Sequence, residues 1–306
     1  MLVQLAKQSK YTIAVILLSA FIISSCSSGP TYNQDDLGTS LRPNGVSIIK
    51  VGNRRFFNSN ACIEFIPRSP NGHIVFIDPG HGGLDPGTVG TTTSGTTVKE
   101  ENIALDVAKK LLKYLLENRF TVVMSRISNT SVARIPSSEI QDGSLTLQGV
   151  ITYLNARPLC ADQAHAQILV GIYFDGYYDP SASGCETLYD PTRPFSKQNY
   201  RLASDIQQAL MQEFSKLGYS VPNRGLINDT QYTAPTITQK GSEYDHLVEL
   251  GPKDPGLVNT PSEMPGAITE PLFLTNPQEA SIAASSRGQH AMATALLNAI
   301  KKYFGV

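Results

Sequence analysis

The sequence has 306 residues, a formal net charge of -1 and 41% hydrophobic residues. That length is enough for one large domain with extensions or for two small domains. The near-neutral charge lacks the basic excess of nucleic-acid-binding proteins, so we expect no nucleic-acid partner. Apart from the absence of Trp, the composition is ordinary for a globular protein.

The first 25 residues have the features of a secretory signal. Lys7 and Lys10 precede an apolar run over 11–23 that is short for a membrane-spanning helix. The run ends in Ile23-Ser24-Ser25-Cys26, which resembles a bacterial lipobox and implies cleavage before Cys26 and acylation of its sulfur. We therefore expect an extracytoplasmic lipoprotein, anchored to a membrane in the periplasm or at the cell surface. The alternative is a plain signal peptide with an incidental cysteine.

The other cysteines suggest little metal chemistry. Acylation of Cys26 would leave Cys62, Cys160 and Cys185, an odd number that cannot all pair even in a compartment that permits disulfides. No CxxC spacing is present, which argues against a zinc site built from thiolates. Cys185 is expected to be a small buried residue.

The chain divides into three parts. A signal peptide over 1–25 is followed by a linker and short extension over 26–71, rich at first in Ser, Gly, Pro, Asn and Asp. VSIIKVG and ACIEFIP in this extension have the length of short strands. Residues 72–306 are expected to form one catalytic domain, and we expect a monomer.

From residue 72 onward, short apolar strands alternate with amphipathic helices, which predicts an α/β fold with a mostly parallel sheet. The predicted strands are IVFID, FTVVMSR, AQILVGIYF and CETLYD. SEYDHLVEL and PGAITEPLF are further apolar runs of strand length. The predicted helices are ENIALDVAKKLLKYLLENR, LQGVITYLNARPLCADQAHA, NYRLASDIQQALMQEFSKLG and QHAMATALLNAIKKYF.

Polar residues follow three of these strands. His81 comes just after IVFID, residues 173–175 follow ILVGI, and Glu270 ends GAIT. In a parallel sheet these ends share one edge, where ligands gather. A lone histidine after a strand is more often structural than a ligand, but the glycines around His81 leave room for a close approach. A carboxylate such as Glu270 at the end of a buried strand is costly unless it is paired or bound to a cation.

Glu100 and Glu101 begin the predicted helix after this loop. One of them is explained by the preference for acidic residues in the first turn of a helix. The other is then available to face the edge as a metal ligand.

Five motifs in order resemble the zinc-dependent N-acetylmuramoyl-L-alanine amidases, from about His73 to Phe304. They are IDPGHGGLDPG, EENIALDVAKKL, ILVGIYFDG with SASGCETLYD, NRGLINDTQY and MPGAITEPLFLTNPQEA. The resemblance implies a twisted mixed sheet flanked by helices, and cleavage of the amide between N-acetylmuramic acid and L-alanine in peptidoglycan. It places His81 and Glu100 as zinc ligands and Glu270 as the catalytic glutamate that handles the proton of a metal-bound water.

The family's third ligand, a histidine in a motif of the form S-I-H-A-N, is replaced by Tyr173 in Gly171-Ile172-Tyr173-Phe174-Asp175. Catalytic zinc normally has three protein ligands, so Tyr173 as a phenolate or Asp175 would have to complete the site for one zinc ion. Glu249 in LVELG also imitates the family's last motif, but the residues flanking Glu270 match it better. His165 and His246 precede their apolar runs and are expected far from this edge.

Three functions remain open at this point. The first is a zinc-dependent peptidoglycan amidase with an altered third ligand. The second is a non-catalytic relative that binds peptidoglycan or regulates another hydrolase, and the third is a hydrolase of a different amide. Retention of His81, Glu100 and Glu270 together favours catalysis, because a binding module does not need all three.

Overall fold

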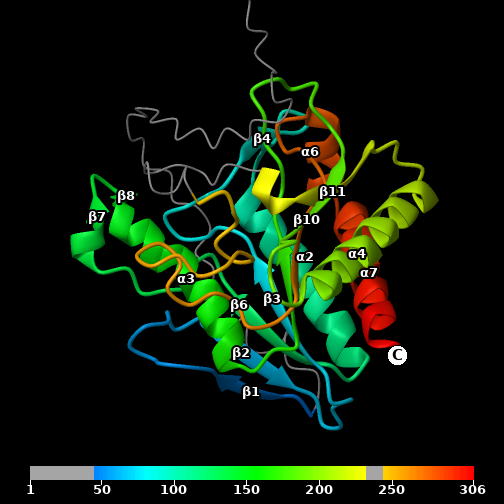
Figure 1. The fold of residues 1–306 in the computed structure, drawn as a ribbon. Coiled ribbons are helices and arrows are strands. Elements are labelled where there is room, and N and C mark those ends of the chain that lie inside the picture. Colours follow the sequence, from blue (N-terminus) through cyan, green and yellow to red (C-terminus); the bar gives the residue numbers. More distant parts are fainter. Residues whose placement is uncertain (1–44, 232–243) are drawn as a thin grey trace, which may run out of the picture.

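The computed structural model describes residues 45–231 and 244–306 (Figure 1). The expected signal peptide, the expected acylation site Cys26 and the first part of the linker lie outside the described residues. Within the described ranges, no helix combines the length and apolar character needed to cross a membrane.

The fold is built on one mixed sheet of eight strands in the order β1-β2-β6-β3-β9-β12-β10-β11. The pairs β6–β3, β3–β9, β9–β12 and β10–β11 are parallel, and the other three pairs are antiparallel. The strands are β1 (Ser47–Lys50), β2 (Ala61–Ile66), β3 (Ile74–Pro79), β6 (Thr121–Arg126), β9 (Ile168–Ile172), β10 (Cys185–Tyr189), β11 (Asn223–Asn228) and β12 (Gly266–Glu270).

Helices cover both faces of this sheet, with α3 on one side and α2, α4 and α7 on the other (Figure 1). The alternation of side chains along a strand explains the two layers: Val75 and Ile77 pack under α2, α4 and α7, whereas Phe76 packs under α3. The helices are α2 (Glu100–Glu117), α3 (Leu147–Gln163), α4 (Ser196–Lys216), α6 (Pro277–Ala284) and α7 (Ser286–Phe304). The small hairpins are β4 (Val89–Thr91) with β5 (Thr97–Lys99), and β7 (Ile140–Gln141) with β8 (Ser144–Leu145).

The predicted α/β fold is thus confirmed, and so is the mixed character of its sheet. β1 and β2, from the expected extension, join the main sheet as its edge, because β2 pairs with β6. The run SEYDHLVEL behaves differently: its described part, Tyr244–Leu250, forms turns and no strand. Those turns leave the apolar side chains of Val248 and Leu250 buried without adding to the sheet.

A disulfide joins Cys62 of β2 to Cys160 of α3, with 5.7 Å between the Cα atoms. It ties β2, the strand next to the edge strand β1, to the helix that covers one face of the sheet. Cys185 is a free, buried thiol at the start of β10.

Candidate active site

Three of the predicted site segments meet at one edge of the sheet. β3, β9 and β12 are parallel neighbours, and the register aligns Pro79 with Ile172 and Ile172 with Thr269. The segments that follow these strands therefore carry His81, Tyr173 and Asp175 to the edge at which Glu270 ends β12. The expectation from parallel strand order is confirmed.

The loop after β3 holds His81 in an unusual backbone conformation. His81 has φ of +59°, in the left-handed region that non-glycine residues seldom adopt. Arg157 of α3 stabilises this turn, since its Nη2 donates a hydrogen bond of 2.8 Å to the His81 carbonyl oxygen. Gly87 passes so close that an added Cβ would lie 2.6 Å from His81 Cδ2 and 2.7 Å from Glu100 Oε2. The absence of a side chain at Gly87 thus allows the backbone to pack against the His81–Glu100 pair.

The imidazole of His81 lies between two carboxylates. Its Nδ1 is 2.8 Å from Asp85 Oδ2, and its Nε2 is 2.9 Å from Glu100 Oε1. Burial opposes the charged imidazole, but Glu100 and Asp85 outweigh it and raise the pKa of His81 to about 10. Although burial acts against the charged Asp85 carboxylate as well, the charge and hydrogen bond of His81 lower the pKa of Asp85 to about 2. The contact of Asp85 with His81 depends on how the loop closes, so no local pattern in the sequence indicated it.

Glu100 is a buried carboxylate with fixed oxygens. The Phe174 backbone N–H donates to Oε1 and the Thr88 backbone N–H donates to Oε2, each over 2.8 Å. Glu100 therefore connects the loop after β3 to the segment after β9. Glu101, the other acidic residue of this turn, instead lies 3.9 Å from Lys99 Nζ.

Tyr173 has its hydroxyl directed at two other acidic residues. The hydroxyl oxygen is 3.1 Å from both Asp78 Oδ2 and Glu249 Oε1, and Asp78 is paired with Arg157. Burial raises the pKa of Tyr173 well above its usual value, which opposes the phenolate form. Burial and the charge of Asp78 also raise the pKa of Glu249. The Tyr173 hydroxyl has one proton and can donate it to only one of these two carboxylates. A protonated Glu249 would donate the other hydrogen bond to the hydroxyl oxygen.

Three further carboxylates, Asp175, Glu186 and Glu270, gather beside Glu100, with ligand oxygens within 4.8 Å of one another. Burial and the charge of Glu186 raise the pKa of Glu270 to about 8. Burial and the charge of Glu270 raise the pKa of Asp175 well above its usual value. Glu186 is paired with Arg224 over 2.5 Å.

The residues fit a zinc ion at two positions. His81 presents Nε2 while a carboxylate accepts from Nδ1, as is usual for metal-bound histidines. Glu100 adds a fixed oxygen, and Gly87 leaves no side chain in the way. The third position is open: in the described ranges, neither cluster of three closely spaced metal-binding side chains includes His81. Of the two candidates for that position, Tyr173 is hydrogen-bonded to Asp78 and Glu249, and Asp175 lies beside Glu270.

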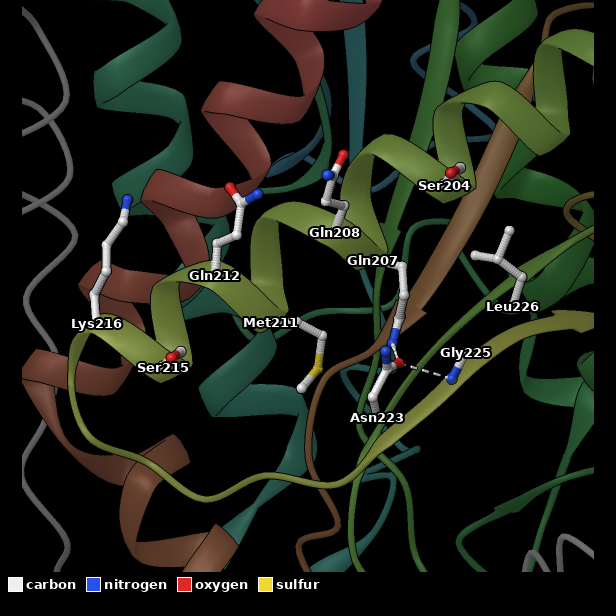
Figure 2. A pocket seen from close by; sticks show the side chains of 10 residues that line it. All are labelled: Ser204, Gln207, Gln208, Met211, Gln212, Ser215, Lys216, Asn223, Gly225 and Leu226. Atoms are coloured by element: carbon white, nitrogen blue, oxygen red, sulfur yellow. Dashed lines mark hydrogen bonds between the residues drawn. The ribbon is translucent and has the colours of Figure 1, made fainter.

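A surface cavity of about 670 Å³ lies away from these residues, between α4 and β11. Figure 2 shows its lining, in which Gln207 and Met211 of α4 face Asn223 of β11, and the Gly225 N–H donates to the Asn223 side chain. The lining contains no histidine and no carboxylate.

A buried acid–histidine pair at the carboxyl edge of an α/β sheet, with a further glutamate nearby, is the kind of site found in metal-dependent hydrolases. The chain belongs to the Amidase_3 family, described as N-acetylmuramoyl-L-alanine amidase, whose model matches residues 75–302. The matched range contains every residue of the candidate site.

Individual relatives agree with this assignment. The chain is 26% identical over 236 residues to the germination-specific N-acetylmuramoyl-L-alanine amidase of Bacillus subtilis, covering 76% of this chain and 81% of that protein. It is 21% identical over 250 residues to AmiA of Escherichia coli, covering 78% of each. The solved CwlD amidase of Clostridioides difficile, in complex with the GerS lipoprotein, has the same fold with a TM-score of 0.56 at 20% identity, over 76% of this chain and 98% of that one.

Proposed function

We propose that this protein hydrolyses the amide bond between N-acetylmuramic acid and L-alanine in peptidoglycan. The observation that carries the proposal is the His81–Glu100 pair, held by Asp85, Phe174 and Thr88 at the sheet edge of an Amidase_3 domain. A protein that only bound cell-wall fragments would have no need for a buried carboxylate fixed against an imidazole.

One zinc ion is the cofactor in this proposal, with His81 Nε2 and Glu100 as two of its ligands. Bound zinc would polarise the scissile carbonyl and make a water molecule acidic. Asp175 is the better candidate for the third ligand. Burial favours its protonated form too, but carboxylates are ordinary zinc ligands, and its Oδ2 has no hydrogen-bond partner among the described residues. Tyr173 would first have to release Asp78 and Glu249 and lose a proton that burial retains.

Glu270 is the general base and acid in this scheme. It lies at the end of β12, retains some exposure to solvent, and has its pKa raised to about 8 by burial and Glu186. A carboxyl group with a pKa near the working pH can both take a proton from water and return it to the leaving amine.

The specific observation in favour of a second candidate, a non-catalytic peptidoglycan-binding or regulatory relative, is the replacement of a ligand by Tyr173. Its hydroxyl belongs to a buried network with Asp78, Glu249 and Arg157, which is an arrangement that stabilises the fold and contributes nothing to a metal. In that case His81 and Glu100 would remain as an ion pair.

We further propose an extracytoplasmic, membrane-anchored location through acylation of Cys26, and a monomeric state. The Cys62–Cys160 disulfide supports the location, because disulfides persist in oxidising compartments outside the cytoplasm. The lipobox-like sequence before Cys26 supports the anchor.

The test is digestion of purified peptidoglycan by the full chain in detergent, with and without added zinc. The expected result is the release of stem peptides whose L-alanine now has a free amino group. His81→Ala and Glu100→Gln should abolish this release. His290→Gln, an exposed histidine on α7, is the matched control. Binding to peptidoglycan without hydrolysis at any zinc concentration would replace this proposal with the second candidate.

A further inference from the structure

A second cluster of metal-binding residues lies at the opposite edge of the sheet. β10 runs antiparallel to β12, and Glu186, near the start of β10, pairs with Glu270 at the end of β12. The carboxyl ends of β10 and β11 therefore point away from the candidate active site. Asp190 directly follows β10 and Asp229 directly follows β11, at neighbouring positions because Tyr189 pairs with Asn228.

His246 brings a ring nitrogen to these two carboxylates. Its Nδ1 lies 3.0 Å from Asp190 Oδ2 and 3.3 Å from Asp229 Oδ2, and the three ligand atoms lie within 4.8 Å of one another. Both aspartates have 0% exposure, whereas the His246 side chain is 13% exposed. Solvent can thus reach the cluster from the histidine side.

The protein's own hydrogen bonds leave part of both carboxylates unsatisfied. Asp190 Oδ1 accepts from the backbone and hydroxyl of Thr192 and from the Arg193 backbone, and Asp229 Oδ2 accepts from the Leu247 backbone. Among the described residues, Asp190 Oδ2, the oxygen nearest the imidazole, has no hydrogen bond with adequate geometry, and Asp229 Oδ1 has none either. One imidazole N–H can satisfy only one of the two facing oxygens.

Such a group is costly in a protein interior unless a cation compensates it. With both buried carboxylates ionised, the cluster carries a net negative charge even when the imidazole is protonated, and unpaired buried charge is strongly destabilising. One nitrogen and two carboxylate oxygens that already converge on a common centre are a normal ligand set for a divalent transition metal.

We propose that Asp190, Asp229 and His246 form a second metal site, selective for zinc or a similar divalent transition metal. The imidazole disfavours calcium and magnesium, which prefer all-oxygen ligand sets. Three protein ligands leave a fourth position for water, on the exposed side of His246. This site shares no residue with the His81–Glu100 pair and does not depend on the proposed amidase activity.

The position of the cluster gives the metal a structural role. His246 belongs to the turns of Tyr244–Leu250, whereas Asp190 and Asp229 belong to the sheet. A metal ion would fasten these turns to the strand ends. Glu249 lies three residues after His246 and contacts the Tyr173 hydroxyl. By holding these turns in place, the same ion would also position Glu249 against Tyr173.

The test is metal analysis of the full chain in detergent, with His81→Ala as the starting variant so that the first site is removed. Zinc is the probe, followed by cobalt for its ligand-field absorption. The expected result is one bound zinc per His81→Ala chain, with a higher melting temperature than the chelated protein. Adding His246→Gln should remove the bound zinc, and adding His290→Gln should leave it in place.

A second variant separates loss of the metal site from misfolding of the chain. Asp190→Asn with Asp229→Asn keeps the size of both side chains, and in the otherwise native chain it should lower the zinc content by one ion while the His81-dependent ion remains. The proposal is overturned if the His81→Ala chain binds no zinc, or if it keeps its zinc after His246→Gln. Absence of amidase activity from the native chain, with this second ion bound, would count against the proposed function alone.

Discussion

The hydroxyl oxygen of Tyr173 lies 3.1 Å from Glu249 Oε1, across 76 residues of sequence. Glu249 comes from the turns before β12, and the sequence resemblance predicts that Tyr173 replaces a metal-binding histidine. In this structure the Tyr173 hydroxyl belongs to the buried network around Arg157.

The Tyr173 hydroxyl should be important for stability. We expect Tyr173→Phe to lower the free energy of unfolding by about 1–3 kcal/mol, since Asp78 and Glu249 would each lose a buried hydrogen-bond partner. Chemical denaturation measures the change. Tyr178→Phe, at a residue 72% exposed, is the control and should stay within about 0.5 kcal/mol of the native chain. Equal effects of the two variants would show that the network contributes nothing.

Asp85 should set the metal affinity of His81. Asp85→Asn keeps the side-chain size but removes the carboxylate that accepts from Nδ1. Loss of such a partner typically weakens metal binding by about 10- to 100-fold. Competition with a chromogenic chelator gives the affinity, and Asp179→Asn, at an exposed carboxylate, is the control. An unchanged affinity would mean that His81 does not hold the ion.

Glu270 should be needed for catalysis and dispensable for binding. We expect Glu270→Gln to reduce the hydrolysis rate by about 10²- to 10⁴-fold, the usual contribution of a general acid or base. Zinc content and affinity for peptidoglycan should stay near the native values. A variant that loses its zinc together with activity would identify Glu270 as a ligand instead.

The raised pKa of Glu270 predicts how stability varies with pH. Its pKa is about 8 in the folded chain and about 4.3 in an unfolded one, so the folded state holds an extra proton between these values. Glu270 therefore favours folding fully below about pH 4, and this contribution is lost as the pH rises through 8.

Glu270→Gln removes the ionisable group, so the variant should not show this loss of stability with rising pH. In the presence of a chelator, the variant should gain stability over the native chain with rising pH, by a quantity of the order of 5 kcal/mol at pH 9. His81 has the same sign of effect between its two pKa values, about 6.5 and 10, and cancels from the comparison. Denaturant midpoints from pH 5 to 9 test this, and a difference independent of pH would contradict the assigned protonation of Glu270.

The disulfide should contribute to stability through the length of chain that it closes. Cys62 and Cys160 are 98 residues apart, and removal of a native disulfide costs about 2–5 kcal/mol. Cys62→Ala with Cys160→Ala should show this loss in chemical denaturation. Treatment of the native chain with a reductant should reproduce it, and should leave the stability of the double variant unchanged. If reduction shifts both proteins equally, the disulfide is absent in solution.

The sequence was sufficient to predict the fold class and to nominate His81, Glu100 and Glu270. Alternating strands and helices are a local pattern, and parallel strands necessarily bring their carboxyl ends to one edge, so the placement of these residues followed from element order. The order of the motifs was likewise enough to indicate the family that the match over 75–302 shows.

The direction of individual side chains was decided only by the tertiary structure. Asp85 faces His81 because the loop closes with a left-handed residue, and Tyr173 turns to Glu249 because distant turns deliver a carboxylate there. The same holds for Asp190, Asp229 and His246, which are far apart in the chain and meet at the end of two parallel strands. Local periodicity determines which residues form a strand or a helix, but contacts between distant segments depend on how the whole chain packs, and no local pattern contains that information.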